Sequence, residues 1–351
     1  MKVSVSTSFD PESWRKILLA CPTSTIYQTI EYSKYEWNSN ETIPSQARTL
    51  HIVVEEEGKP MGCLLLTRNR FCPFPFLPKM MSEHIKIDEY VSRGGPVIIT
   101  DDPYKRSEVF DLIIRATKTF AEKEGVSHIR VIPFLHELDQ SKARKLGFNI
   151  DYYTTIYMDL VPDLGMIWKR LHKHSRTSVR AARKRGVTIV ECNDRDDMKE
   201  IYYLYLLSRR RTGLPFIPID RFERYWDIFY PNNMLHLFLA KQGRKVIAGT
   251  AALSFNKTII YDINFSLEEY WYNHPNDLLT WHLIEYGKKN GFRLIDFEMA
   301  TSKAGIMEFK KNWGKPQTYL SFQKGWFWSH LVRVLETNMK KIKNYLSGIN
   351  F

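Results

Sequence analysis

The sequence of 351 residues has few cysteines and no long apolar run. Its four cysteines, Cys21, Cys63, Cys72 and Cys192, form no CxxC pair and no regular framework. A chain this long can fold without disulfides, so we expect buried or idle thiols of a reducing compartment. No apolar run approaches the ~20 residues that a membrane-spanning helix requires. The first residues, MKVSVSTSFDPESW, lack the apolar segment of a signal peptide, so we expect a cytoplasmic protein.

Acidic residues are in the minority. The chain has 51 Lys and Arg against 39 Asp and Glu, which gives a net charge of +12. This excess favours a polyanionic partner, such as nucleic acid, a phosphorylated metabolite or an anionic membrane face, although lysines that only aid solubility would produce it as well. Hydrophobic residues make up 44% of the chain, which excludes a largely disordered protein. The length favours two domains.

The same order of elements is predicted twice along the chain. Each half reads as two helices, a three-strand meander, a helix, a strand, a helix and a strand. In the first half, Asp10 and Asp102 each precede a proline and predict helix starts. In the second half, Asp163 predicts a helix that ends before Gly186. The strands predicted there are Val187–Glu191, Met234–Ala240, Lys245–Phe255, Thr258–Phe265, Arg293–Met299 and Gln317–Gln323.

This order is that of the GNAT fold, by analogy. We therefore predict a mixed α/β fold, with a mixed sheet, made of two tandem GNAT-like domains at residues 1–161 and 162–323. Residues 324–351 are aromatic and basic, and we expect a helix that packs back on the first domain. Contact of this helix with an anionic membrane surface is the alternative.

A run of basic residues on the helix after Asp163 is the clearest chemical feature. Its cations recur at spacings of four, three, four and four, in the order Lys169, Lys173, Arg176, Arg180 and Lys184. Aligned cations repel one another, and a diphosphate or a tRNA backbone would neutralise them. A merely solvated helix face is the alternative. Arg211 belongs to a second cluster at a helix end, where cations also complement the helix dipole.

The second half lacks a glycine-rich turn where acetyl-CoA-dependent GNAT enzymes bind pyrophosphate. That turn uses backbone amides and a helix N-terminus to hold the anion. Here residues 264–275 contain no glycine, include two glutamates and carry bulky aromatic side chains. This composition argues against acetyl-CoA and leaves the helix start near Asn276 open to another oxygen-rich group.

Two carboxylates and a lysine follow in the last third of the chain. Asp296 and Glu298 alternate with apolar residues, so we expect both on one face at the end of a strand, where ligands often gather in α/β sheets. A carboxylate there could hold or deprotonate an attacking amine, or could simply pair with a neighbouring cation. Lys310 lies on a short helix and points away from its apolar face. His172 and His174 diverge on a helix, so we expect no metal site.

Three segments resemble the FemABX family and its FemAB-like relatives. The first contains Leu171–Arg176, Arg180–Lys184 and Gly186–Val187. The second contains Tyr261, Asn264, Ser266, His274–Leu279 and Trp281. The third contains Gly291–Phe292, Asp296–Phe297, Gly305–Ile306, Phe309–Lys310 and Trp313–Gly314. The resemblance implies transfer of an aminoacyl group from aminoacyl-tRNA to the peptide of a nucleotide- or lipid-linked muropeptide. It also implies that Lys310, in the Phe-Lys motif, takes part in catalysis.

Our hypothesis is an acyltransferase in which an amine attacks the acyl carbonyl directly, without a metal or resident cofactor. Lys310 and Asp296 are the expected catalytic residues. The expected substrate-binding residues are Arg176, Arg180, Arg211, Tyr261, Asn264 and Asn276. We expect a monomer that uses tRNA as donor, with possible contact to the inner membrane face. The alternatives are an acyl-CoA-dependent N-acyltransferase acting on a sugar or amino acid, and a non-catalytic binder of tRNA or anionic membrane.

Overall fold

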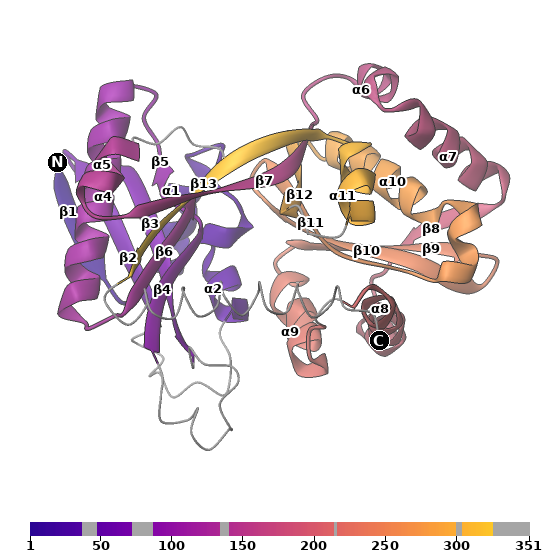
Figure 1. Cartoon of the computed structure of the whole chain (residues 1–351), viewed down its shortest axis with the longest axis horizontal. Coiled ribbons are helices and arrows are strands. Elements are labelled where there is room, and N and C mark those ends of the chain that lie inside the picture. Colours follow the sequence, from indigo (N-terminus) through magenta and orange to yellow (C-terminus); the bar gives the residue numbers. More distant parts are fainter. Residues whose placement is uncertain (37–47, 72–86, 134–139, 214–215, 300–303, 326–351) are drawn as a thin grey trace, which may run out of the picture. The chain divides into compact units, whose positions relative to one another are not determined.

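The computed structural model describes residues 1–36, 48–71, 87–133, 140–213, 216–299 and 304–325 (Figure 1). Nearly all of the predicted C-terminal helix lies outside these ranges. Among the described helices, none combines the length and apolar character needed to cross a bilayer. Cys21, Cys63 and Cys192 are buried free thiols, as predicted, and Cys72 is outside the described residues.

The chain forms two compact units that are not continuous in sequence. Unit 1 contains Met1–Cys21, Glu36–Tyr152 and Leu320–Phe351, and unit 2 contains Pro22–Tyr35 and Tyr153–Tyr319. The domain limits expected from the sequence, 1–161 and 162–323, remain predictions.

Unit 1 is a twisted sheet with its helices packed on it. Its strands follow the order β1-β2-β3-β4-β6-β13, and β5 pairs with β3. Among the strand pairs that the structure describes in this unit, β4 and β6 are parallel and the others are antiparallel. The elements are β1 (Lys2–Ser6), α1 (Pro11–Leu19), β2 (Thr49–Glu56), β3 (Lys59–Phe71), β4 (Ile87–Gly94), β5 (Val97–Ile98), α4 (Pro103–Lys123), β6 (His128–Pro133), α5 (Gln140–Lys145) and the end of β13 (Lys315–Gly325).

Helix α4 closes the core of unit 1. Asp102 caps it by accepting hydrogen bonds from the backbone N–H groups of Tyr104 and Lys105, which confirms the predicted start. Val109 and Ile113 are fully buried, and they pack with residues of β2, β3 and β6. Their spacing of four residues places both side chains on one face of the helix, the face that covers the core.

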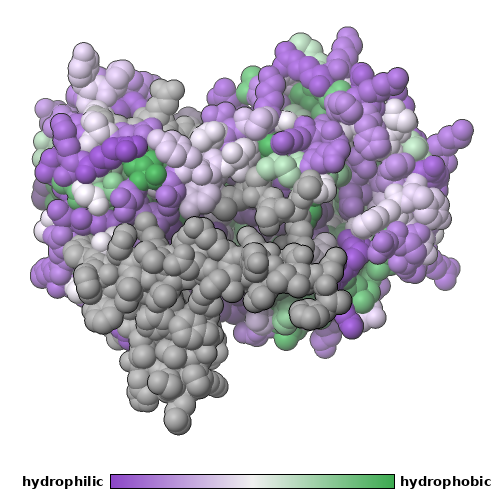
Figure 2. Space-filling model, in the orientation of Figure 1, coloured by the Kyte–Doolittle hydropathy of each residue, from purple (hydrophilic) through white to green (hydrophobic). Residues whose placement is uncertain are grey.

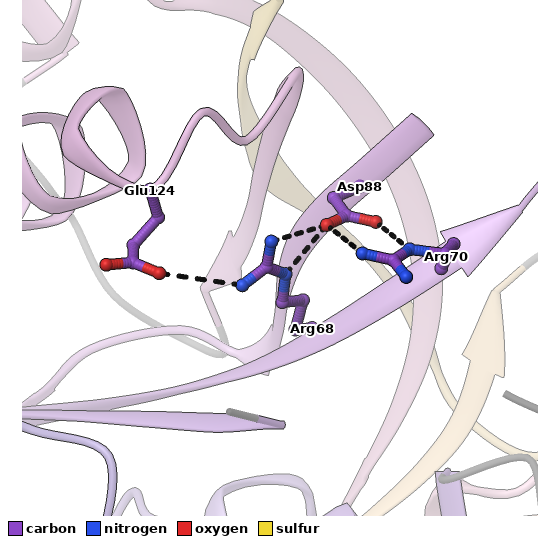
Figure 3. A network of polar contacts seen from close by, with 4 residues as sticks. All are labelled: Arg68, Arg70, Asp88 and Glu124. Atoms are coloured by element: carbon purple, nitrogen blue, oxygen red, sulfur yellow. Dashed lines mark hydrogen bonds and ion pairs between the residues drawn. The ribbon is translucent and has the colours of Figure 1, made fainter. Parts of the chain in front are cut away.

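Strand β4 was not predicted, because two adjacent carboxylates, Asp88 and Glu89, stand in it. Arg68 and Arg70 of the neighbouring β3 both bind Asp88, and Arg68 also lies 3.7 Å from Glu124 (Figure 3). Burial alone would raise the pKa of Asp88, but the hydrogen bonds and charges of the two arginines outweigh it and lower this pKa below its usual value. Cross-strand charge pairing thus allows a charged segment to form an interior strand.

Unit 2 repeats the pattern of pairings found in unit 1. Its order is β8-β9-β10-β11-β12-β7, with β11 and β12 parallel and the other pairs antiparallel. The elements are η1 (Ile26–Gln28), α2 (Ile30–Glu36), β7 (Asn149–Asp159), α6 (Leu164–Arg170), α7 (Lys173–Lys184), β8 (Val187–Glu191), η3 (Arg195–Asp197), α8 (Met198–Thr212), α9 (Ile219–Phe229), β9 (Leu235–Gln242), β10 (Lys245–Phe255), β11 (Thr258–Ser266), η4 (Glu268–Asn273), α10 (Pro275–Lys289), β12 (Leu294–Met299) and α11 (Ala304–Lys311).

Each sheet is completed by a strand from the other half of the sequence. Strand β7, the last strand of the first half, pairs with β12 in unit 2. Strand β13, the last strand of the second half, pairs with β6 in unit 1. The mixed α/β fold is confirmed, and this exchange of final strands was not foreseen, because sequence periodicity identifies strands without their partners.

The prediction of one continuous basic helix after Asp163 is wrong. Leu171 and His172 have extended ψ angles of 150° and 142°, so the segment breaks into α6 and α7. Leu171 is buried, and the His172 ring accepts a hydrogen bond from the N–H of His174 at 3.3 Å as the cap of α7. Of the five cations predicted to share one helix, Lys169 therefore lies on α6, and the other four lie on α7.

Strands β11 and β12 part soon after they start. They pair only from Thr258 to Ile260 on β11, opposite Leu294 to Asp296 on β12. Beyond this point β11 stays with β10, with a bulge that leaves Asp262 without a counterpart in the register. Strand β12 stays with β7 and has its own bulge between Asp296 and Met299. The two strand ends thus present side chains around an opening in the ladder.

Candidate functional site

Helix α11 brings Lys310 to the diverging ends of β11 and β12. The Lys310 Nζ lies 3.5 Å from the carbonyl oxygen of Glu298. Burial lowers the pKa of this ammonium, and the charges of Glu298, Asp296 and Asp262 oppose the shift. The lysine is half-buried rather than an ordinary surface residue. Three carboxylates and one ammonium therefore occupy one small region of unit 2.

Asp296 is almost fully buried, with 6% of its surface exposed. Its Oδ1 accepts hydrogen bonds from Thr155 Oγ1 at 2.5 Å and from the Glu298 N–H at 2.8 Å. Burial raises the pKa of Asp296 to about 7, and the Glu298 charge adds to the increase, while the Thr155 hydrogen bond and the Lys310 charge oppose it. A carboxyl that titrates near neutral pH is suited to accept a proton.

Two tyrosines complete this group of residues. Tyr27 of η1 donates a hydrogen bond to Glu298 Oε1 at 2.5 Å, and Tyr225 of α9 donates to Asp262 Oδ2 at 2.8 Å. Burial and the nearby carboxylates raise the pKa of both phenols, so they stay protonated as donors. Neither tyrosine, nor Thr155, was among the predicted site residues.

The predicted residues Tyr261 and Asn264 lie on β11, and Asn276 lies in the first turn of α10. Tyr261 is buried, with its hydroxyl 3.3 Å from Thr280 Oγ1. Asn276 Nδ2 donates to Ser266 Oγ at 3.1 Å. The Oδ1 atoms of Asn264 and Asn276 are buried without a hydrogen-bond partner among the described residues. A bound group that donates hydrogen bonds would satisfy both oxygens.

Arg211 is tied to the same end of β11. Its Nη1 donates to the carbonyl oxygen of Ser266 at 2.9 Å, and its guanidinium lies 4.4 Å from the centre of the Trp271 ring. Trp271 Nε1 in turn donates to Ser266 Oγ at 3.0 Å. Ser266 thus links Arg211, Trp271 and Asn276, and the arginine keeps an exposed surface for a ligand.

The start of α10 is poorly suited to a pyrophosphate. The preceding turn is the 3-10 helix η4, whose Asn273 side chain is bound to Gln242, and His274 adopts a left-handed conformation with φ 53°. Asp277 occupies the first turn of α10, and burial raises the pKa of its carboxyl to about 6. At neutral pH its charge already complements the positive end of the helix, where an anion would otherwise bind.

The two predicted arginines, Arg176 and Arg180, both lie on α7. The guanidinium of Arg180 is 5.4 Å from the centre of the Trp168 ring, and its side chain is exposed. Arg176 is half-buried on the same helix. Neither arginine is among the charged groups that shift the pKa of Lys310 or Asp296. Their role in binding remains a prediction.

Helices α6 and α7 present a basic surface. Lys169, Lys173, Arg180 and Lys184 are all exposed, and so are Arg170, Arg183 and Arg185. Figure 2 shows mostly hydrophilic residues over this part of the molecule. Val179 and Ala182 of α7 are fully buried against the core of unit 2. A phosphate backbone would find several cations on this surface.

The arrangement around Lys310 can support transfer of an acyl group. A nucleophile that loses a proton needs a nearby base, and a carbonyl under attack needs a donor for its developing negative charge. Asp296 and Lys310 offer these two functions within one group of residues. Among the described residues, no cluster of His, Cys, Asp and Glu has the geometry of a metal site.

The sequence profile described as the acetyltransferase (GNAT) domain matches residues 169–311. This chain contains a GNAT domain. A search of curated protein sequences finds no match. Strands β11 and β12, helix α10 and the residues Asp262, Asp296, Glu298 and Lys310 all lie within residues 169–311.

Solved structures show a likeness over nearly the whole chain. The crystal structure of FemX superposes with a TM-score of 0.72 at 16% identity, over 96% of this chain and 100% of FemX. The structure of L-PGS from Bacillus licheniformis gives a TM-score of 0.53 at 12% identity, over 89% and 91% of the two chains. The C-terminal domain of a putative lysylphosphatidylglycerol synthetase from Agrobacterium fabrum gives 0.51 at 13% identity, over 82% and 87%. The chain thus has a FemX-like fold, and the resemblance found in the sequence is confirmed at that level.

Proposed function

We propose that this protein transfers an aminoacyl group from aminoacyl-tRNA to the amine of an acceptor, such as the peptide of a peptidoglycan precursor. The observation that carries the proposal is the grouping of Lys310 and Asp296 around Glu298, at the parting strands of the GNAT domain. Burial raises the pKa of Asp296 to about 7, and the charge of the half-buried Lys310 ammonium opposes this rise. An acyltransferase is the activity class that these residues and the GNAT domain support together.

In the proposed reaction, the acceptor amine attacks the ester carbonyl directly. A carbon–nitrogen bond forms, the ester carbon–oxygen bond breaks, and the proton lost by the amine passes to Asp296. Lys310 stabilises the oxyanion and supplies a proton to the leaving oxygen. Alignment of the two substrates and stabilisation of the oxyanion provide most of the rate increase.

The choice of donor rests on two features of the GNAT domain. First, the turn before α10 has no glycine, and Asp277 occupies the helix start that would hold a pyrophosphate. Second, the exposed cations of α6 and α7 suit the repeated phosphates of tRNA. The likeness to FemX supports the same choice, because the family that the sequence resembles uses charged tRNA.

The proposal also covers the fold of unit 1 and the place of the reaction in the cell. Unit 1 is proposed to be a second GNAT-like domain, because its strand order and its single parallel pair repeat those of unit 2. A charged-tRNA donor implies a cytoplasmic reaction. A lipid-linked acceptor would add contact with the inner membrane face.

An acyl-CoA-dependent N-acyltransferase is the second candidate, favoured by the acetyltransferase profile itself. One experiment separates the candidates. The protein is incubated with charged bulk tRNA or with acetyl-CoA, each with a panel of muropeptides, amino sugars and amino acids, and products are identified by mass spectrometry.

We expect an acceptor whose mass increases by one aminoacyl residue only with charged tRNA. An acetylated product made with acetyl-CoA would replace the proposal with the second candidate. Salt-sensitive tRNA binding without any product would indicate a non-catalytic binder.

A further inference from the structure

Glu298 has an unusual backbone conformation at the centre of the site. Its φ is 57°, in the left-handed region that favours glycine, although it lies within strand β12. The register of β12 against β7 skips here, so that Phe297 and Glu298 stand opposite the single residue Ile156. A residue with a Cβ pays about 1–2 kcal/mol for this conformation, and bulges of this kind often redirect side chains next to active sites.

Every polar group of Glu298 contacts a different member of the site. Its N–H donates to Asp296 Oδ1 at 2.8 Å, and its carbonyl oxygen lies 3.5 Å from Lys310 Nζ. Its carboxylate accepts the hydrogen bond from Tyr27 at 2.5 Å. One residue therefore connects the proposed base, the proposed oxyanion donor and a tyrosine that lies 271 positions earlier in the chain.

The charge of Glu298 also acts on both catalytic groups. It raises the pKa of Asp296, together with burial, and it opposes the lowering of the Lys310 pKa by burial. The hydrogen bond from Tyr27 fixes the position of this charge, because Tyr27 is itself held in place. It belongs to η1, in which Ile26 is fully buried and Thr25 and Gln28 form a capping box of reciprocal hydrogen bonds.

We propose that Glu298 and Tyr27 are positioning residues for the transfer reaction. Tyr27 holds the Glu298 carboxylate, and Glu298 in turn orients Lys310 through its carbonyl and sets the protonation of Asp296 through its N–H and its charge. This inference rests on the proposed function for its kinetic consequences. Its electrostatic part can be measured without any substrate.

Three variants separate the backbone of Glu298 from its side chain. Glu298→Gln removes the charge, Tyr27→Phe removes the hydrogen bond, and Glu298→Gly keeps the left-handed backbone at no steric cost while removing the carboxylate. Glu308→Gln, on the exposed face of α11, is the matched control. Circular dichroism verifies that each variant is folded, and Glu298→Gly remains available if Glu298→Gln does not fold.

We expect Glu298→Gln, Glu298→Gly and Tyr27→Phe each to lower kcat about 10-fold to 100-fold, with KM changed much less, because the reacting groups are misplaced. The double variant Tyr27→Phe/Glu298→Gln should be no slower than the slower single variant, since both changes break one interaction. Wild-type kcat in Glu298→Gly, or additive losses in the double variant, would overturn the proposal.

The substrate-free measurement is a ¹³C NMR titration of the Asp296 side chain in the full-length protein. Removing the Glu298 charge should lower the pKa of Asp296 from about 7, and Glu308→Gln should leave it unchanged. An unchanged Asp296 pKa in Glu298→Gln would contradict the inference. Because no donor is needed, this result holds even if the protein proves not to transfer an aminoacyl group.

Discussion

Replacing Lys310 with methionine tests the assignment of the oxyanion donor. The substitution keeps most of the apolar stem and removes the ammonium. Loss of one oxyanion donor costs about 2.7–4 kcal/mol, so we expect kcat to fall about 100-fold to 1,000-fold. Lys311 on the same helix is exposed, so Lys311→Met is the matched control and should retain wild-type activity.

The structure predicts a second effect of Lys310→Met. The Lys310 charge lowers the pKa of Asp296 from the value that burial alone would give. Without it, Asp296 should bind its proton more tightly, and the acid limb of the pH–rate profile should move to higher pH. The assay is single-turnover transfer with charged tRNA from pH 5.5 to 9. A kcat within threefold of wild type at every pH would remove Lys310 from the mechanism.

Two further predictions concern stability. A Cβ on Gly314 would lie 2.5 Å from the backbone oxygen of Tyr157, so Gly314→Ala should lower the free energy of unfolding by about 2 kcal/mol or more. A Cβ on Gly305 of α11 would have no atom within 4 Å, so Gly305→Ala should raise the free energy of unfolding by up to about 1 kcal/mol. Urea denaturation of both variants tests this prediction, and equal effects would contradict it. Burial lowers the pKa of His51 to about 4 in the folded protein. The unfolded chain therefore binds a proton at His51 at higher pH than the folded protein does, so acid favours unfolding and stability is lost as the pH falls from 6.5 toward 4. At pH 5 this loss is about 2 kcal/mol, and His51→Leu should be less acid-sensitive than wild type by that amount; an unchanged difference between pH 7 and pH 5 would contradict it.

Local signals in the sequence were sufficient for most of the secondary structure. Asp10, Asp102 and Asp163 each cap a helix as predicted, and strand β10 begins and ends at the predicted residues, Lys245 and Phe255. These features depend on neighbouring residues and on side-chain alternation, which a sequence shows directly. The break at Leu171–His172 carries neither glycine nor proline, so no local signal marked it.

The site was only partly predictable, for a physical reason. Asp296 and Lys310 were predicted as site residues because a strand end and a family motif marked them. Tyr27 joins Glu298 across 271 positions, and Glu298 takes a backbone conformation that its residue type does not favour. Such contacts arise from tertiary packing and from a bulge, which override local preferences at functional sites.

The central claim is that Asp296 accepts the proton of the attacking amine. Its most direct test is the single-turnover rate of aminoacyl transfer from charged tRNA, measured against pH for wild type and for Asp296→Asn. We predict that the wild-type rate rises with pH through about 7, as Asp296 loses its proton, and that Asp296→Asn is at least about 100-fold slower without this limb. A wild-type rate independent of pH around 7, or an Asp296→Asn variant with the wild-type rate and profile, would contradict the account.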